Sequence, residues 1–166
     1  MSATPRRVAD LGAELVDRAL TTAVAESLTG GLVVAELVSV PGISAVLHGG
    51  VVAYATPLKR DVVGVDGDLL AREGAVHPGV AAQLAERVRT ALAVDGIPAR
   101  VGLGTTGVAG PDPQDGQAVG TVFVAVALDD RTEVRELALA GDRAAIRRGA
   151  VEAVLALLDE VLVTSR

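Results

Sequence analysis

Apolar residues follow helical spacing in some segments of the chain and form short continuous runs in others. Helical spacing predicts one helix with Pro5 in its first turn and apolar residues over 8–16, and another over 30–38. Two more are predicted from His77-Pro78 and over 142–162, the last capped by Asp142. Continuous runs predict strands at 21–25, 50–55 and 100–103. Because strands and helices alternate, we expect a parallel sheet with helices on its faces.

The pattern changes in the last third of the chain. A Gly/Pro-rich stretch over 104–116 predicts a loop, and two apolar runs at 120–128 and 132–139 flank the polar turn Asp129-Asp130-Arg131. Two such runs around a short turn are typical of an antiparallel hairpin. The sheet is therefore expected to be mixed, and 166 residues without a linker or repeat suggest one domain over 1–166.

Composition excludes several classes of function. The chain has no cysteine, which removes disulfides and thiolate nucleophiles. A net charge of −6 argues against nucleic acid as a partner. No apolar run approaches the roughly 20 residues that span a bilayer, and the N-terminal stretch lacks the apolar core of a signal peptide. We expect a cytoplasmic protein that binds neither membranes nor nucleic acid.

A glycine motif and two histidines are weak candidates for cofactor or metal sites. The segment 102–107, GLGTTG, matches the G-x-G-x-x-G spacing of dinucleotide-binding turns, but the prolines that follow forbid the helix this motif requires. A ligand can still approach such a glycine-rich segment closely. His48 and His77 have no metal-site spacing, and His77 is expected to begin a helix.

The segment 25–31, AESLTGG, places Ser27 between a predicted strand and a predicted helix. Serine is favoured as a helix N-cap, so Ser27 can have a purely structural role. The capping box is absent because Gly30 stands where Glu or Gln would reach back. Thr29 can itself serve as the cap, which leaves Ser27 available as a nucleophile.

A serine nucleophile needs a base, and Lys59 is the only lysine in the chain. It follows Tyr54 just beyond the second predicted strand, at the sheet edge where parallel strands place their sites. A free lysine has a pKa of about 10.4, so a lysine base must be desolvated or near another cation. Backbone N–H groups over 28–31 can hold an oxyanion. A surface lysine is the alternative.

Arg143 and Arg147 lie one turn apart near the start of the last predicted helix, where cations oppose the helix dipole. An anionic ligand group can offset this, because the arginine fork matches phosphate oxygens. An ion pair with surface acids or with a neighbouring subunit is the equal alternative.

Five ordered segments resemble the nicotinamide-nucleotide amidohydrolases (PncC), also called the CinA C-terminal domain family. They are AESLTGG, GGVVAYATPLK, EGAVHPGVAAQLAE, TTGVAGPDPQDGQAVGTVFVAV and GDRAAIRRGAV. The resemblance implies a three-layer α/β/α sandwich with a mixed, mainly parallel sheet. It also implies hydrolysis of nicotinamide mononucleotide to nicotinate mononucleotide and ammonia, in pyridine nucleotide recycling, without cofactor or metal and in a homo-oligomer. A catalytically silent nucleotide-binding or oligomeric scaffold of the same fold, and hydrolysis of another small amide, are the alternatives.

The resemblance also implies roles for particular residues. Ser27 would be the nucleophile, Lys59 the base and Tyr54 its aromatic partner. The expected oxyanion, nucleotide and phosphate contacts come from Thr29, Gly30, Gly31, Thr106, Gly107, Ala109, Gly110, Arg143 and Arg147. The chain departs from the family pattern at Leu28, where cysteine is usual, at His77, where serine is usual, and in the less glycine-rich loop 111–118. These changes bear on loop shape and substrate preference.

Overall fold

The computed structural model describes residues 7–165, so the predicted position of Pro5 lies outside the described residues. The strands are β1 (Thr22–Glu26), β2 (Leu47–Val52), β3 (Val101–Gly107), β4 (Thr121–Leu128) and β5 (Arg131–Ala138). The α-helices are α1 (Val8–Asp17), α2 (Leu32–Val38), α3 (Thr56–Leu58), α4 (Gly67–Glu73), α5 (Pro78–Ala91) and α6 (Arg143–Thr164). A 3₁₀ turn, η1 (Ile43–Ala45), and a π-helical turn, η2 (Lys59–Val63), complete the elements.

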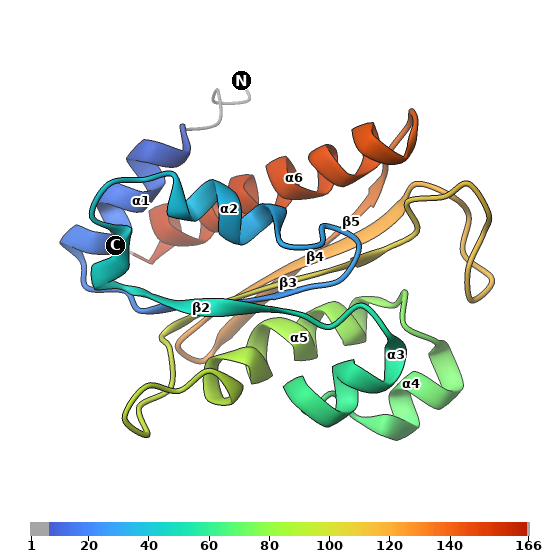
Figure 1. Ribbon diagram of the computed structural model, residues 1–166, viewed down its shortest axis with the longest axis horizontal. Helices are drawn as coiled ribbons and strands as arrows, with labels where there is room; N and C mark the ends of the chain where they lie inside the picture. Colours follow the sequence, from blue (N-terminus) through green and yellow to red (C-terminus); the bar gives the residue numbers. More distant parts are fainter. Residues whose placement is uncertain (1–6, 166) are drawn as a thin grey trace.

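The strands form one mixed sheet in the order β2-β1-β3-β4-β5. β1 pairs in parallel with β2 and β3, whereas β3–β4 and β4–β5 are antiparallel. Helices α1, α2 and α6 cover one face, and α3, α4 and α5 cover the other (Figure 1). The predicted three-layer α/β/α architecture and the C-terminal hairpin are therefore confirmed.

The central strands are apolar because both of their faces are covered. All five residues of β1 are buried, and β4 is buried from Val122 to Leu128. The edge strand β5 instead mixes charged and apolar residues, and none of its residues is buried. Helix α6 contributes the largest apolar row of any described helix, running from Ile146 to Leu162. The aliphatic core thus fills the space on both faces of the sheet.

The segment 104–107, expected to be loop, is the second half of β3. A Cβ at Gly102 would lie 1.8 Å from the carbonyl oxygen of Ala85, and one at Gly104 would lie 2.6 Å from that of Ala81. Both carbonyls belong to α5, so the glycines allow this helix to pack directly on the strand. The G-x-G spacing is therefore a packing feature of β3.

Strand β2 lies three residues earlier than the predicted strand at 50–55. A Cβ at Gly50 would lie 2.2 Å from Cγ2 of Val34, so α2 packs closely there as well. The predicted caps are confirmed at two helices. The Asp142 carboxylate accepts from Ala145 N–H, and Nδ1 of His77 accepts from Gly79 N–H.

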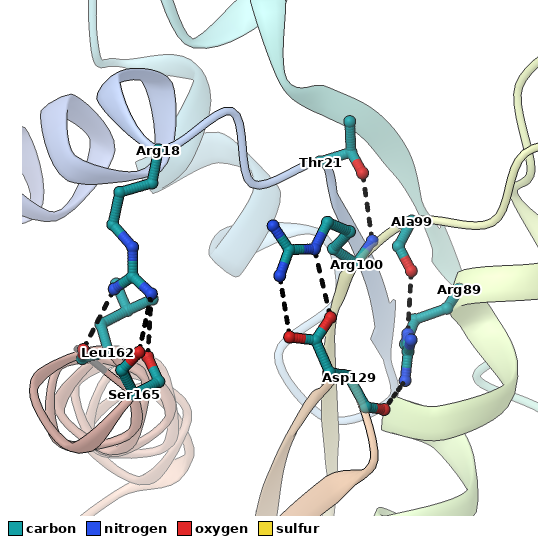
Figure 2. Close-up of polar contacts among 8 residues, drawn as sticks. All are labelled: Arg18, Thr21, Arg89, Ala99, Arg100, Asp129, Leu162 and Ser165. Carbon is teal, nitrogen blue, oxygen red and sulfur yellow. Dashed lines mark hydrogen bonds and ion pairs between the residues drawn. The ribbon is translucent and has the colours of Figure 1, made fainter.

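Polar contacts close the sheet edge where β1 and β3 begin (Figure 2). The Arg100 guanidinium donates to both carboxylate oxygens of Asp129, at 3.1 and 2.8 Å, and its backbone N–H donates to Oγ1 of Thr21. Arg89 donates to the carbonyls of Ala99 and Asp129. Arginine side chains thus link the starts of these strands to the β4–β5 turn. The candidate site lies at the opposite end of the sheet, where β1 and β2 end.

Candidate active site

The candidate site begins where β1 and β2 end side by side. Glu26 and Val52 are register partners in the parallel pair, and Ala53 N–H donates to the Glu26 carbonyl at 2.9 Å. Ser27 follows the first strand directly, and Tyr54 follows the second by two residues. The predicted convergence of these segments at one sheet edge is therefore observed.

A cavity of about 270 Å³ opens at this edge. Ser27 lies in its wall with only 8% of its surface exposed. Among the described residues, the Ser27 hydroxyl has no hydrogen-bond partner, so it is available to a ligand. The walls are formed by Ser27, Leu28, Tyr54, Ala55, Thr56, Ala75, Val76, Thr106, Gly107, Val108, Ala109, Gly110, Asp112, Gln114 and Arg143.

The turn that carries Ser27 is capped by Glu26, not by Thr29 as expected. The fully buried Glu26 carboxylate accepts from the N–H groups of Gly31, Val33 and Val34 at 3.0 to 3.1 Å. These are first-turn donors of α2, which otherwise have no intrahelical acceptor. A carboxylate satisfies several of them at once and complements the helix dipole, so Thr29 is not needed as a cap.

Two further side chains hold the same turn. Oγ1 of Thr105 accepts from Ser27 N–H at 3.3 Å and lies 2.9 Å from Oγ1 of Thr29. Arg147 donates from Nε to the Leu28 carbonyl at 2.8 Å and from Nη2 to the Thr29 carbonyl at 3.1 Å. The guanidinium of Arg147 therefore positions the turn, in place of the expected phosphate contact or ion pair.

The predicted binding residues divide into two groups. Thr106, Gly107, Ala109 and Gly110 line the cavity, and Thr106 donates to the Ala75 carbonyl in its wall. Thr29, Gly30 and Gly31 do not line it. Two of their N–H groups already have acceptors: Gly30 N–H donates to the Ser27 carbonyl, and Gly31 N–H donates to the Glu26 carboxylate.

Two N–H groups of the turn remain available. Those of Leu28 and Thr29 have no acceptor within residues 7–165. Leu28 directly follows Ser27 and lines the cavity. An N–H next to a nucleophilic serine is a common oxyanion donor, so the set over 28–31 reduces to these two.

Lys59 is buried next to Tyr54, one of the residues that line the cavity, and has 1% of its surface exposed. Its Nζ donates to the carbonyls of Ala53 at 2.8 Å and Tyr54 at 3.2 Å. Burial lowers the pKa of Lys59 from 10.5 to about 8, while the negative charge of Asp115 acts in the opposite direction. Lys59 also begins η2, and π-helical turns occur frequently at functional sites. The alternative of a surface lysine is therefore wrong.

Tyr54 and Arg143 meet at the mouth of the cavity. The Tyr54 side chain is exposed, and its hydroxyl accepts from Nη2 of Arg143 at 2.9 Å. Nη1 of Arg143 donates to the Gly110 carbonyl at 2.6 Å. Contact between Tyr54 and Lys59 runs through the Tyr54 carbonyl, not through its ring. The phenol thus lies beside a cation at the entrance.

Sequence reasoning missed Glu26 and Thr105. The signal for Glu26 is a single acid that ends an apolar strand and precedes a glycine-rich turn, because a charge in a buried run needs partners. Thr105 has no comparable signal, since its contact with Ser27 joins residues 78 positions apart.

No three His, Asp or Glu side chains of the described chain gather as a metal site. Nδ1 of His48 contacts the Leu92 carbonyl, and His77 caps α5. None of the helices within 7–165 has the length and apolarity needed to cross a bilayer.

The CinA C-terminal domain family matches residues 6–162. A CinA-like protein of Frankia casuarinae is 49% identical over 148 residues, which are 89% of this chain and 33% of that protein. The chain thus spans about a third of this relative's length.

Solved structures of the same superfamily share the fold. A competence-damaged protein (CinA) superfamily protein of Klebsiella pneumoniae has a TM-score of 0.87 at 28% identity, covering 95% of this chain and 96% of the other. The competence/damage inducible protein CihA of Agrobacterium tumefaciens has a TM-score of 0.83 at 29% identity, covering 97% and 99%.

Proposed function

This chain belongs to the CinA C-terminal domain family, and on that basis we propose that it is a serine amidohydrolase acting on nicotinamide mononucleotide. The products would be nicotinate mononucleotide and ammonia. The observation that carries the proposal is the buried Lys59, whose amine donates to the carbonyl of Ala53, the residue that is hydrogen-bonded to the end of the Ser27 strand at Glu26. A buried amine that is neutral in part near pH 8 is suited to general-base work.

The reaction would proceed in two halves. Lys59 accepts the proton of Ser27 Oγ as that oxygen bonds to the carboxamide carbon, and the oxyanion forms beside the Leu28 N–H group. The C–N bond breaks, and the Lys59 ammonium returns the proton to the leaving nitrogen, so ammonia departs. Water then attacks the ester, Lys59 takes a proton from it, and Ser27 Oγ is released with that proton.

The cavity entrance is where the nucleotide part would bind. Arg143 is the cation of the cavity lining, and its guanidinium is fixed by Gly110 and Tyr54. A fork held in this way can bind a phosphate with little further loss of side-chain freedom. Arg147 is not part of this contact, since it does not line the cavity and its guanidinium holds the Ser27 turn.

Ammonia release from nicotinamide mononucleotide tests the proposal. We expect turnover by the wild-type chain and a loss of about 10³-fold or more in Ser27→Ala, because the covalent step is removed. Ser44→Ala is the matched control, an exposed serine remote from the cavity. A wild-type chain that releases no ammonia contradicts the proposal, and so does equal release by Ser27→Ala. Glutamine and free nicotinamide as alternative amides test substrate class.

A further inference from the structure

Two Asp-Gly turns of the molecule have nearly the same backbone. Residues 94–97 and 114–117 are each closed by two reciprocal backbone hydrogen bonds of 2.8 to 3.1 Å. Asp95 and Asp115 both have a φ of +51°, and the glycine after each also has a positive φ. These are the requirements of a type I′ turn, for which Asp-Gly is preferred. The two loops project from opposite ends of the sheet (Figure 1).

The side chains of these two turns differ. Oδ2 of Asp115 accepts from Ala75 N–H at 2.9 Å, and the amide of Gln114 lies 3.5 Å from the same oxygen. A Cβ on Gly74 would lie 2.6 Å from Cβ of Asp115, so the close approach requires glycine there. The Asp95 carboxylate makes no hydrogen bond or ion pair with any described residue. Turn geometry therefore does not explain why Asp115 points inward.

The bond from Asp115 reaches the wall of the cavity. Ala75 lines the cavity and accepts from Thr106 through its carbonyl. Asp112 and Gln114, from the same loop as Asp115, also line the cavity. One carboxylate thus joins the loop between β3 and β4 to the segment between α4 and α5, and the two together form part of the cavity.

Asp115 is also the acid whose charge acts on Lys59. Other charged groups nearby have different partners: Arg60 and Asp61, on the same segment as Lys59, pair with each other at the surface. Arg87, on α5, donates to the Gly64 carbonyl. The Glu26 carboxylate accepts from N–H groups at the start of α2.

We infer that Asp115 is a positioning residue of the Ser27–Lys59 site: its carboxylate accepts from Ala75 N–H and so fixes the 111–118 loop to the cavity wall. The inference rests on the proposed function only for its effect on turnover. The fixed loop would shape the cavity for the substrate, and the negative charge of Asp115 would offset part of the effect of burial on the pKa of Lys59. This gives a role to the loop in which the chain departs from its family's pattern.

The single lysine allows a direct test that does not depend on activity. Protein labelled with ¹³C at lysine Cε gives one side-chain signal, that of Lys59, whose titration midpoint can be followed by NMR. In Asp115→Asn the turn and the acceptor for Ala75 N–H are kept and the charge is lost, so the midpoint is expected to fall below that of wild type. Asp95→Asn, the matched turn, is expected to leave it unchanged.

A second variant separates the effect of the hydrogen bond to Ala75 from the effect of the charge. Asp115→Gly keeps the left-handed backbone but removes the bond to Ala75, so we expect a lower midpoint and a KM for nicotinamide mononucleotide raised several-fold, with Asp95→Gly as its control. An unchanged midpoint in Asp115→Asn would show that the Asp115 charge does not act on Lys59. An unchanged KM in Asp115→Gly would show that the hydrogen bond to Ala75 does not shape the cavity. If the wild-type chain has no amidase activity, the NMR result still decides the first point.

Discussion

Glu26 and Lys59 are the two charged side chains that are fully buried in the described structure, and their surroundings differ. Each belongs to a segment at the same sheet edge, one at the end of β1 and the other after β2. The Glu26 carboxylate accepts from three N–H groups, whereas the Lys59 ammonium donates to two carbonyls that are neutral dipoles.

This difference separates a structural charge from a reactive one. The donors of α2 make the Glu26 carboxylate part of the helix start, where it fixes the turn that carries Ser27. Lys59 is less well compensated, so burial disfavours its charged form and lowers its pKa to about 8. A buried charge with incomplete compensation lowers stability, and function can use the pKa that results.

Replacing Lys59 by methionine is expected to have the largest effect. Loss of the general base should reduce amidase turnover by about 10² to 10⁴-fold. Stability should be kept or raised, because methionine fills similar space without a charge to desolvate. Turnover and thermal unfolding of the same preparations check both parts.

Arg60→Met is the matched control for this substitution, since Arg60 is exposed and pairs with Asp61 at the surface. It should retain wild-type turnover. If Lys59→Met kept full activity, or unfolded while Arg60→Met did not, Lys59 would be a structural residue like Glu26.

The pH dependence of stability should also reveal Lys59. Below pH 8 the folded and unfolded chains both carry the ammonium, so the cost of burying it is fully present. Between about pH 8 and 10.5 the folded chain loses this proton first, the unfolded chain binds more protons, and stability rises with pH. The gain in the free energy of unfolding can reach roughly 3 kcal/mol, because each pH unit between the two pKa values contributes about 1.4 kcal/mol.

Denaturant unfolding at pH 7 and pH 10 measures this contribution as the difference between wild type and Lys59→Met. The gain attributed to Lys59 should be missing from the variant. An equal rise in the two proteins would mean that other groups cause it and that Lys59 titrates as it does in the unfolded chain.

Much of this fold could be predicted because apolar periodicity reflects burial. The central strands, the hairpin and the starts of α5 and α6 are where the sequence pattern places them. The segment 104–107 was mistaken for loop because glycine and threonine are common in loops. Its strand structure depends on the close packing of α5 on Gly102 and Gly104, a contact between segments about 20 residues apart.

The candidate site could be predicted in part for the same reason. Ser27 and Lys59 follow two strand ends, and the rule for parallel sheets places such residues together. The burial of Lys59 and the commitment of Arg147 to carbonyl groups depend on long-range contacts that no local pattern records. Resemblance to a family supplied the pairing, but only the structure distinguishes the residues that line the cavity from those that support it.

Of the substitutions compared, Glu26→Gln is expected to have the smallest effect on amidase turnover. Glutamine keeps the shape of glutamate but has one acceptor oxygen, and its amide group turns a donor toward the N–H groups of α2. At least one of these buried or half-buried N–H groups then loses its partner, at a cost of about 1 to 3 kcal/mol in the free energy of unfolding. Urea unfolding at pH 7 measures the loss.

Glu36→Gln, an exposed substitution on the same helix, is the control and should stay within about 0.5 kcal/mol of wild type in its free energy of unfolding. Because Glu26 supports the Ser27 turn without touching the cavity, the folded variant should retain more turnover than Lys59→Met. Wild-type stability combined with a loss of turnover as deep as that of Lys59→Met would reverse the two roles and make Glu26 the reactive charge.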